Sequence, residues 1–268
     1  MEEIISPQNS LFKMAAALRQ KKYREETGLF VIEGVRLFEE AVQADWDMTA
    51  IIGTAKGYNQ PRVQTLLRKW QHRNCRVVAV QENLYAKITD TEQPQGLMGL
   101  VRQKNVSLQE LAVKDHTFIT VLDGVQDPGN VGTLIRVADA AGCHAVVLTK
   151  GCADLYAGKV VRATMGSLFH LPVVRDADGA ALVEWLTQNG ITLFATALTE
   201  AAIYHHCDLT RSVAVAFGNE GSGLSGFLLN SAREKITIPL YGQAESLNVA
   251  TSAAVILYEA ARQRQLNL

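Results

Sequence analysis

The chain has 268 residues, of which 48% are hydrophobic and 20% charged, and its formal net charge is −1. This composition argues against a disordered or fibrous chain and against a generic binder of polyanions, and the length predicts a globular protein of two domains. No apolar run reaches the ~18 residues of a membrane span, and the N-terminal MEEIISPQNS lacks the order of a signal peptide, so we expect a cytoplasmic protein.

The first part of the chain is basic and predicts a small α/β domain. Residues 1–105 hold 15 lysines and arginines against 12 acidic residues, whereas residues 106–268 hold 11 against 15, so the first part is the better candidate for contacts with phosphate. Its stretch KMAAALRQKKYR, residues 13–24, contains no acid, although a solvated helix face explains such a cluster equally well. From Leu29 onward, short apolar runs alternate with runs of helical spacing. The predicted strands are 29–33, 49–53, 76–80 and 96–101, and the predicted helices are 34–44, 60–71 and 82–89.

The second half alternates in the same way after a polar linker at 106–115. The predicted strands are 117–123, 145–149, 171–174, 191–198, 212–218 and 235–239, and the predicted helices are 130–142, 156–166, 178–190, 224–232 and 246–263. Near-continuous apolar strands between helices indicate a parallel sheet that helices cover on both faces. The last helix is apolar all round, which predicts burial between layers or contact with a second copy of the chain.

The cysteine and histidine pattern does not favour a metal site. Cys75, Cys143, Cys152 and Cys207 form no CxxC pair, so we expect them to be reduced and mostly buried. The triplet HHC at 205–207 is an alternative ligand set, but adjacent side chains point in different directions. We therefore expect no metal.

Three loops at predicted strand ends have unusual composition, and ligands of open parallel sheets bind where loops leave the carboxyl ends of strands. The first loop is DGVQDPGNVGTLIR, residues 123–136. Its Pro128 and Gly129 predict a turn, Asn130 can cap the following helix, and Arg136 lies further along that helix. A plain turn with a cap and a surface arginine is the alternative interpretation.

The second loop is FGNEGSGLS, residues 217–225, in which three glycines surround Glu220. Glycine lets a ligand approach backbone N–H and C=O groups closely. The spacing is not that of the dinucleotide fingerprint, and the loop has no lysine, so it is not a phosphate loop. An acidic residue here suits a ligand with positive charge or with hydroxyl and amine donors, while a simple strand-to-helix turn is the alternative.

The third loop is IPLYGQAESLNVATS, residues 238–252, which places Ser246 and Asn248 at the start of the final helix. Each side chain could serve only as a helix cap. Two polar side chains at the mouth of an apolar helix could equally hold a substrate hydroxyl or order a neighbouring loop.

In this order and at these separations, NVGTLIRVADAAG, FGNEGSGLS and IPLYGQAESLNVATSAAVILYE resemble the three motifs of the SpoU (TrmH-type) family of S-adenosylmethionine-dependent RNA ribose 2′-O-methyltransferases. The resemblance spans residues 116–268, and residues 1–105 resemble a ribosomal-protein-like RNA-binding domain. It implies an α/β fold of the SPOUT class, with a parallel sheet and a C-terminal trefoil knot, an exception to the rule against threaded chains. It also implies a homodimer in which two subunits contribute to each site.

The resemblance also implies roles for individual residues. The catalytic set is Asn130, Arg136, Glu220, Ser246 and Asn248, and the positions expected to hold S-adenosylmethionine are Thr196, Ala197, Leu198, Gly218, Ile238 and Leu247. The residues expected to contact the RNA backbone are Lys13, Lys21, Lys22, Arg24 and Arg36.

The family mechanism assigns the general base to the arginine that matches Arg136. Because a guanidinium with a pKa above ~12 does not lose its proton readily, we interpret Arg136 as a group that orients phosphate and lowers the pKa of the ribose hydroxyl. The proton then leaves to a phosphate oxygen, to Glu220 or to water.

Three other functions are compatible with parts of the sequence. The chain could be an RNA-binding protein that keeps the fold without the chemistry, or an enzyme that acts on transfer RNA rather than ribosomal RNA. A nucleotide-dependent α/β enzyme is disfavoured because the sequence has neither GxGxxG nor a Walker lysine.

Overall fold

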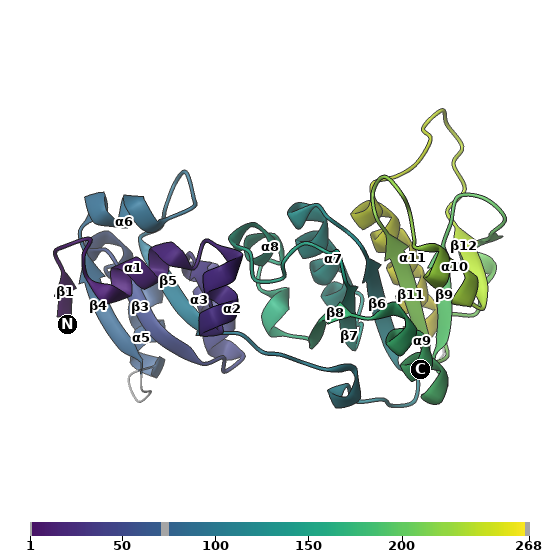
Figure 1. Cartoon of the computed structure of the whole chain (residues 1–268), viewed down its shortest axis with the longest axis horizontal. Coiled ribbons are helices and arrows are strands. Elements are labelled where there is room, and N and C mark those ends of the chain that lie inside the picture. Colours follow the sequence, from purple (N-terminus) through teal and green to yellow (C-terminus); the bar gives the residue numbers. More distant parts are fainter. Residues whose placement is uncertain (1, 71–74, 266–268) are drawn as a thin grey trace. The chain divides into compact units, whose positions relative to one another are not determined.

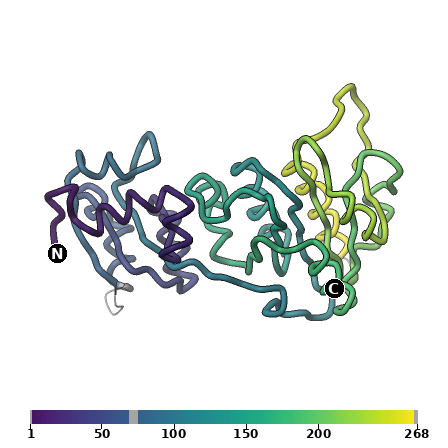
Figure 2. Tube along the Cα trace, in the orientation of Figure 1, coloured from purple at the N-terminus to yellow at the C-terminus, as the bar shows by residue number. Residues whose placement is uncertain are grey.

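The computed structural model of the protein describes residues 2–70 and 75–265. The chain divides into two compact units, which we describe separately (Figures 1 and 2). The first unit comprises Met1–Lys104 and Tyr156–Phe169, and the second comprises Asn105–Leu155 and His170–Leu268. Gln71, the last residue of the helix predicted at 60–71, lies outside the described residues. Within the described ranges, no helix is both long and apolar enough to cross a membrane.

The first unit is built on a mixed five-stranded sheet in the order β1-β4-β3-β5-β2. The strands are β1 (Glu2–Ile4), β2 (Leu29–Glu33), β3 (Met48–Gly53), β4 (Arg76–Val80) and β5 (Leu97–Arg102). The helices are α1 (Ser10–Ala17), α2 (Lys21–Thr27), α3 (Val35–Gln43), α4 (Ala55–Tyr58), α5 (Pro61–Trp70), α6 (Glu82–Ile88) and α8 (Gly158–Ala163), followed by the 3-10 turn η2 (Ser167–Phe169). Strand β5 runs antiparallel to both of its neighbours, β2 and β3. The predicted α/β domain is therefore confirmed.

Helix α3 illustrates why the elements of the first unit form where they do. Its buried residues Val35, Phe38 and Ala41 recur every three positions, which places them on one face of a helix. Gly34 precedes the helix with a φ of 91°, a conformation that suits glycine. The helix therefore begins at the end of β2 and packs its apolar face on the sheet.

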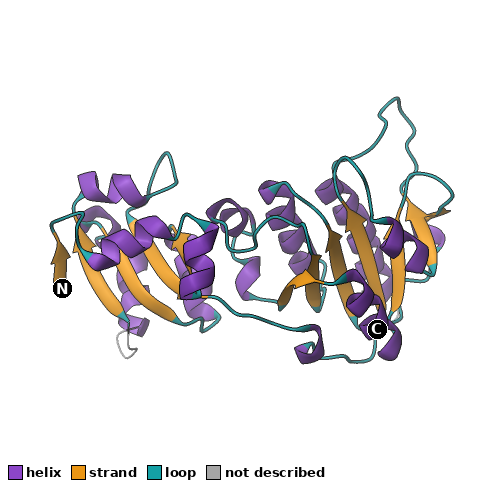
Figure 3. Ribbon diagram, viewed as in Figure 1, coloured by secondary structure: helices purple, strands orange, loops and turns teal. Residues whose placement is uncertain are grey.

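The second unit is a seven-stranded sheet, parallel at every pairing, in the order β10-β12-β9-β11-β6-β7-β8 (Figure 3). The strands are β6 (Phe118–Asp123), β7 (Ala145–Thr149), β8 (Val173–Ala177), β9 (Thr192–Thr196), β10 (Ala202–Ile203), β11 (Val213–Gly218) and β12 (Glu234–Thr237). The helices are α7 (Pro128–Ala140), α9 (Gly179–Gln188), α10 (Gly226–Ser231) and α11 (Val249–Gln265), with the 3-10 turns η1 (Leu108–Glu110) and η3 (Tyr204–His206). The predicted parallel sheet is confirmed.

The central strands of the second unit are buried on both faces. Every residue of β6, β7 and β11 is buried, which is the pattern of a parallel strand covered by helices on each side. One face packs on α9 through Leu182 and Trp185, and Leu108 and Leu111 of the segment expected as a linker join the same core. Helix α11 packs against α7 and β11. The knot that the family resemblance implies stays a prediction.

Candidate active site

Four loops leave adjacent parallel strands at one edge of the second sheet. The strands β12, β9, β11 and β6 are neighbours in this order, and parallel pairing puts all their carboxyl ends at the same edge. Gly218 of β11 pairs with Asp123 of β6, and Thr196 of β9 pairs with Ile236 of β12. The loops that carry the three motifs therefore start side by side (Figure 3).

A chain of side-chain hydrogen bonds joins the three motifs at this edge. The amide of Asn130 donates to Glu220 Oε1 at 2.9 Å, and the amide of Asn248 donates to Asn130 Oδ1 at 3.0 Å. The backbone N–H groups of Gln126 and Asp127 also point to the Glu220 carboxylate, at 3.4 Å each. Three of the five predicted catalytic residues thus form one network, which holds the loops after β6 and β11 against the start of α11.

The cap of helix α7 is Asp127 and not Asn130, which the sequence allows as a cap. Asp127 Oδ1 accepts the backbone N–H of Asn130 at 2.8 Å, and Pro128 occupies the first helical position, where a missing N–H costs nothing. Asn130 lies in the first turn of α7, so its side chain is free to join the network. Asn248, in contrast, does both: its Oδ1 accepts the N–H of Ala250 at 2.9 Å while its amide donates to Asn130.

The network sets the charge of Glu220. Burial raises the pKa of this carboxyl group, but hydrogen bonds from Asn130 and from the loop N–H groups outweigh it, so the pKa lies below its ordinary value. A lowered pKa in the folded protein means that ionised Glu220 contributes stability above the unfolded pKa of about 4.3, and that this stability is lost as the pH falls through the folded value. Glu220 is therefore an anion at neutral pH and a weak proton acceptor.

The glycine loop after β11 closes on itself without room for a side chain at Gly218. A Cβ atom at Gly218 would lie 2.2 Å from both the carbonyl carbon of Gly223 and the nitrogen of Leu224, which are backbone atoms that cannot rotate away. Asn219 and Gly223 exchange two backbone hydrogen bonds of 2.9 Å. Gly223, at the far end of the turn, has a φ of 71°. The glycines at 218 and 223 are therefore required by the close approach and the backbone conformation.

Two residues that sequence reasoning missed anchor this loop. Asp123 is buried, and its two oxygens accept the Thr149 hydroxyl and the Ser225 backbone N–H, each at 2.7 Å. The amide of Asn219 donates to the Gly124 carbonyl at 2.9 Å, and its oxygen accepts two N–H groups of its own loop. The sequence offered a signal for each residue: Asp123 ends a buried strand, and Asn219 stands next to a glycine.

The other predicted site residues do not join the network among the described residues. Arg136 on α7 and Ser246 are exposed, and neither side chain has a hydrogen bond or ion pair within the described part of the chain. The Thr196 hydroxyl donates to the Ala216 carbonyl at 2.9 Å, which ties β9 to β11. The side chains of Leu198 and Leu247 are 68% and 37% exposed, so these loops present apolar surface as well as polar groups.

The comparison with protein-family models matches both parts of the chain. The model described as SpoU rRNA Methylase family matches residues 117–258, more than half of the chain. The chain belongs to this family. A second model, described as MRM3-like substrate binding domain, matches residues 9–99.

Relatives and solved structures of SpoU enzymes match along nearly the whole chain. A protein of Bacillus subtilis (strain 168) named 23S rRNA (guanosine(2553)-2′-O)-methyltransferase RlmP is 37% identical over 96% of this chain and 98% of its own length. The AdoMet-bound rRNA methyltransferase from Sinorhizobium meliloti superposes with a TM-score of 0.89 at 34% identity, covering 97% of each chain. The SpoU methyltransferase AviRb from Streptomyces viridochromogenes, in complex with AdoMet, gives a TM-score of 0.88 at 29% identity, covering 96% of this chain and 99% of that one.

In this SpoU chain, the basic stretch of the first unit is less positive than its sequence suggests. Lys21 and Lys22 on α2 are exposed, but each faces an acid one turn later: Lys21 lies 3.5 Å from Glu25 and Lys22 lies 3.8 Å from Glu26. Lys13 on α1 is exposed. The pairs are exposed and weak, so the lysines stay available to a polyanion.

Arg24 does not belong to that basic surface, and its prediction as an RNA contact is corrected. Its side chain is buried, with an exposed fraction of 5%, and its guanidinium donates to the carbonyls of Leu18 and Arg19 at 2.7 Å each. It therefore closes the end of α1. Arg36 on α3 is exposed, and its Nε donates to the Met165 carbonyl at 3.2 Å.

Proposed function

We propose that this protein transfers a methyl group from S-adenosylmethionine to a ribose 2′-hydroxyl of ribosomal RNA. The single observation that carries the proposal is the Asn130–Glu220–Asn248 network, which ties the three family motifs together at the edge where parallel sheets bind ligands. The named activity of the Bacillus relative supports the same reaction and the ribosomal substrate. A ribosomal RNA substrate is consistent with the cytoplasmic location that the sequence predicts.

The residues at this edge fit S-adenosylmethionine. We assign its binding to Thr196, Ala197, Leu198, Gly218, Ile238 and Leu247. The absent side chain at Gly218 lets the glycine loop fold tightly over the end of β11, and exposed Leu198 and Leu247 suit an apolar aromatic ring. The anionic Glu220 would disfavour a phosphate but suits a positively charged ligand. When bound, this cofactor supplies a methyl group on a positively charged sulfonium, so the transfer needs no metal.

The protein residues position the ribose and its hydroxyl proton. The planar guanidinium of Arg136 has five N–H donors and no side-chain partner among the described residues, so we assign it to an RNA phosphate next to the target ribose. Hydrogen bonds from Asn130 and the loop N–H groups keep Glu220 anionic, and the hydroxyl proton leaves to Glu220, to a phosphate oxygen or to water. We assign two roles to Asn130, Ser246 and Asn248: they contact the ribose, and they hold the loops of the site in place. Alignment of the reacting atoms can supply about 7–11 kcal/mol of the barrier.

Nucleoside mass spectrometry tests the proposed function. Ribosomal RNA that lacks its own methylation is incubated with the protein and S-adenosylmethionine, digested to nucleosides and analysed. We expect a 2′-O-methylated nucleoside that is absent without the cofactor. Methylation of a base, methylation of transfer RNA in preference to ribosomal RNA, or RNA binding without any methylation would each reject the proposal as stated.

We propose further that the active protein is a homodimer that uses the exposed face of α11. Thr251, Val255, Tyr258 and Arg262 recur every three or four positions, and Tyr258 is 53% exposed although it is a large aromatic residue. Tyr258→Glu is expected to convert the dimer to a monomer in sedimentation velocity. Tyr23→Glu, at another exposed tyrosine, is the matched control and should stay dimeric. A monomeric wild-type protein, or a Tyr258→Glu protein that remains dimeric, would contradict this assignment.

The lysines of the first unit are expected to contribute to the salt dependence of RNA binding. The slope of log affinity against log salt decreases by roughly 0.7–0.9 for each phosphate that a lysine no longer neutralises, so the triple variant of Lys13, Lys21 and Lys22 to glutamine should reduce the slope by about 2. Fluorescence anisotropy over a series of salt concentrations measures this slope. A control with Lys56, Lys114 and Lys150 changed to glutamine removes the same charge elsewhere and should leave most of the slope in place. Equal slopes for the two variants would contradict the assignment of Lys13, Lys21 and Lys22 to the RNA backbone.

A further inference from the structure

The first unit contains a pocket at the junction of β2 and α3. Its volume is about 230 Å³, well above the ~30 Å³ that one water molecule occupies. Polar side chains at its wall are Glu33, Arg36, Gln93, Gln95 and Arg162. Apart from Arg36, none of these residues has a role in the site described above.

Glu33 provides an acceptor whose hydrogen bonds are incomplete. Its Oε1 accepts the backbone N–H of Asp90 at 3.1 Å, whereas Oε2 is buried and has no hydrogen-bond partner among the described residues. Burial raises the pKa of Glu33 above its ordinary value. A buried carboxylate oxygen without a donor is unfavourable, and ligand N–H groups would satisfy it. Oε2 is shielded at present, so the carboxyl group must turn toward the pocket, which its soft terminal torsion permits.

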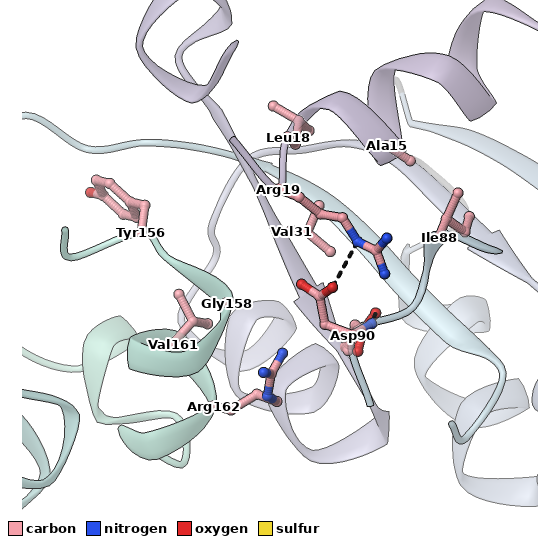
Figure 4. A pocket seen from close by; sticks show the side chains of 11 residues that line it. Ala15, Leu18, Arg19, Val31, Ile88, Asp90, Tyr156, Gly158, Val161 and Arg162 are labelled. Atoms are coloured by element: carbon pink, nitrogen blue, oxygen red, sulfur yellow. Dashed lines mark hydrogen bonds and ion pairs between the residues drawn. The ribbon is translucent and has the colours of Figure 1, made fainter. Parts of the chain in front are cut away.

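Two arginines provide donors at the same pocket. Arg162 on α8 is half-buried, and its guanidinium has no hydrogen bond or ion pair within the described ranges. Arg162 also lines a small neighbouring pocket that shares Glu33 with the first one (Figure 4). It takes no part in the ion pair drawn there, in which Arg19 Nε lies 2.7 Å from Asp90. Arg36 uses its Nε on the Met165 carbonyl, and its two terminal nitrogens have no partner among the described residues.

We propose that this pocket binds an unpaired guanine base of the substrate RNA. The proposal rests on the proposed function for the identity of the ligand as RNA. Guanine is the base that presents two adjacent donors, N1–H and the 2-amino group, which match the two oxygens of Glu33 once its carboxyl group has turned toward the pocket. Its O6 and N7 are acceptors that an arginine recognises. Unpaired bases of RNA are read in this way, on their polar edges, by proteins that also contact their faces.

The other bases match the pocket less well. Uracil offers one N–H between two carbonyl groups, and adenine and cytosine place an acceptor beside their amino group, which a carboxylate repels. The wall also contains Tyr85 and Leu37, both almost fully buried, and the exposed side chain of Met165. The Met165 side chain gives the pocket apolar surface for the face of a ring.

Fluorescence anisotropy with short RNAs tests the pocket. The probes are fluorescein-labelled 11-mers of uridine with guanosine, inosine, adenosine or uridine at the central position, measured with the full chain and no cofactor. We expect the guanosine probe to bind about tenfold more tightly than the adenosine probe, as one bidentate contact provides. Inosine, which lacks the 2-amino group, should fall between them.

Glu33→Gln should abolish this preference, because its amide NH2 opposes the donor edge of guanine, and Arg162→Ala should weaken it. Glu82→Gln, which removes an exposed carboxylate of the same unit, is the matched control and should keep the tenfold ratio. Thermal unfolding verifies that each variant is folded. Equal affinities for the guanosine and adenosine probes, or a preference that survives Glu33→Gln, would overturn the proposal. If the protein transfers methyl groups but has no preference for guanine, the proposed role of the pocket is wrong and the proposed function stands. If it prefers guanine but transfers no methyl group, the proposed function is wrong and the role of the pocket stands.

Discussion

Arg136→Ala is expected to lower the rate of methyl transfer by about 10²–10³-fold, the usual effect of removing a group that stabilises charge in a transition state. The affinity for S-adenosylmethionine should change little, because Arg136 is assigned to the RNA and not to the cofactor. Single-turnover transfer of a labelled methyl group measures the rate, and a calorimetric titration measures the cofactor affinity. Arg211→Ala, at another exposed arginine of the second unit, is the control and should retain activity.

The lysine variant separates two roles for Arg136. Lysine keeps the positive charge but lacks the planar fork that grips phosphate with two parallel hydrogen bonds. Arg136→Lys is therefore expected to remain at least about tenfold slower than the wild type, since an ammonium group cannot form both parallel bonds. A lysine variant with nearly full activity would contradict the need for the fork and would favour a purely electrostatic role.

Gly218→Ala is expected to abolish measurable binding of S-adenosylmethionine. The added Cβ would lie 2.2 Å from backbone atoms of Gly223 and Leu224, so the loop has to open to accept it. Overpacking of this kind costs about 1–3 kcal/mol, and here the displaced atoms belong to the loop assigned to the cofactor. Calorimetric titration with S-adenosylmethionine and thermal unfolding measure the two effects.

Gly221→Ala is the matched control for Gly218→Ala. Gly221 lies in the same loop, has no positive φ, and a Cβ there meets its nearest neighbour, Asn219 Oδ1, at 3.6 Å, an ordinary contact. We expect Gly221→Ala to leave the free energy of unfolding within about 0.5 kcal/mol of the wild type and cofactor binding intact. If both alanine variants bind the cofactor equally well, the close approach at Gly218 does not shape the site.

The sequence was sufficient for every strand of the second sheet except β10, and the site that it places at the strand ends stays a prediction. Buried parallel strands such as 118–123 and 213–218 are apolar throughout, and their ends coincide with the unusual loops. Strands β1 and β10 were missed because three and two residues are too short to produce a pattern. Their existence depends on a neighbouring strand that offers its edge.

The errors in the sequence predictions concern the roles of individual side chains. These roles depend on hydrogen-bond partners that a local sequence pattern does not identify. The sequence allows Asn130 as the cap of α7. The hydrogen bonds show that the helix begins earlier, with Asp127 as its cap and Pro128 in its first turn. A cluster of basic residues does not distinguish Arg24, which is buried against two carbonyl groups, from the exposed lysines beside it. Asp123 meets Ser225 across 102 positions of sequence, and no local pattern predicts such a contact.

Hydrogen–deuterium exchange with and without S-adenosylmethionine tests most directly whether the cofactor binds at the edge organised by Glu220. We predict slower exchange on binding in residues 196–198, 218–225 and 238–248, with little change in the first unit. Protection confined to other segments, or no protection at saturating cofactor, would contradict the assignment of the site.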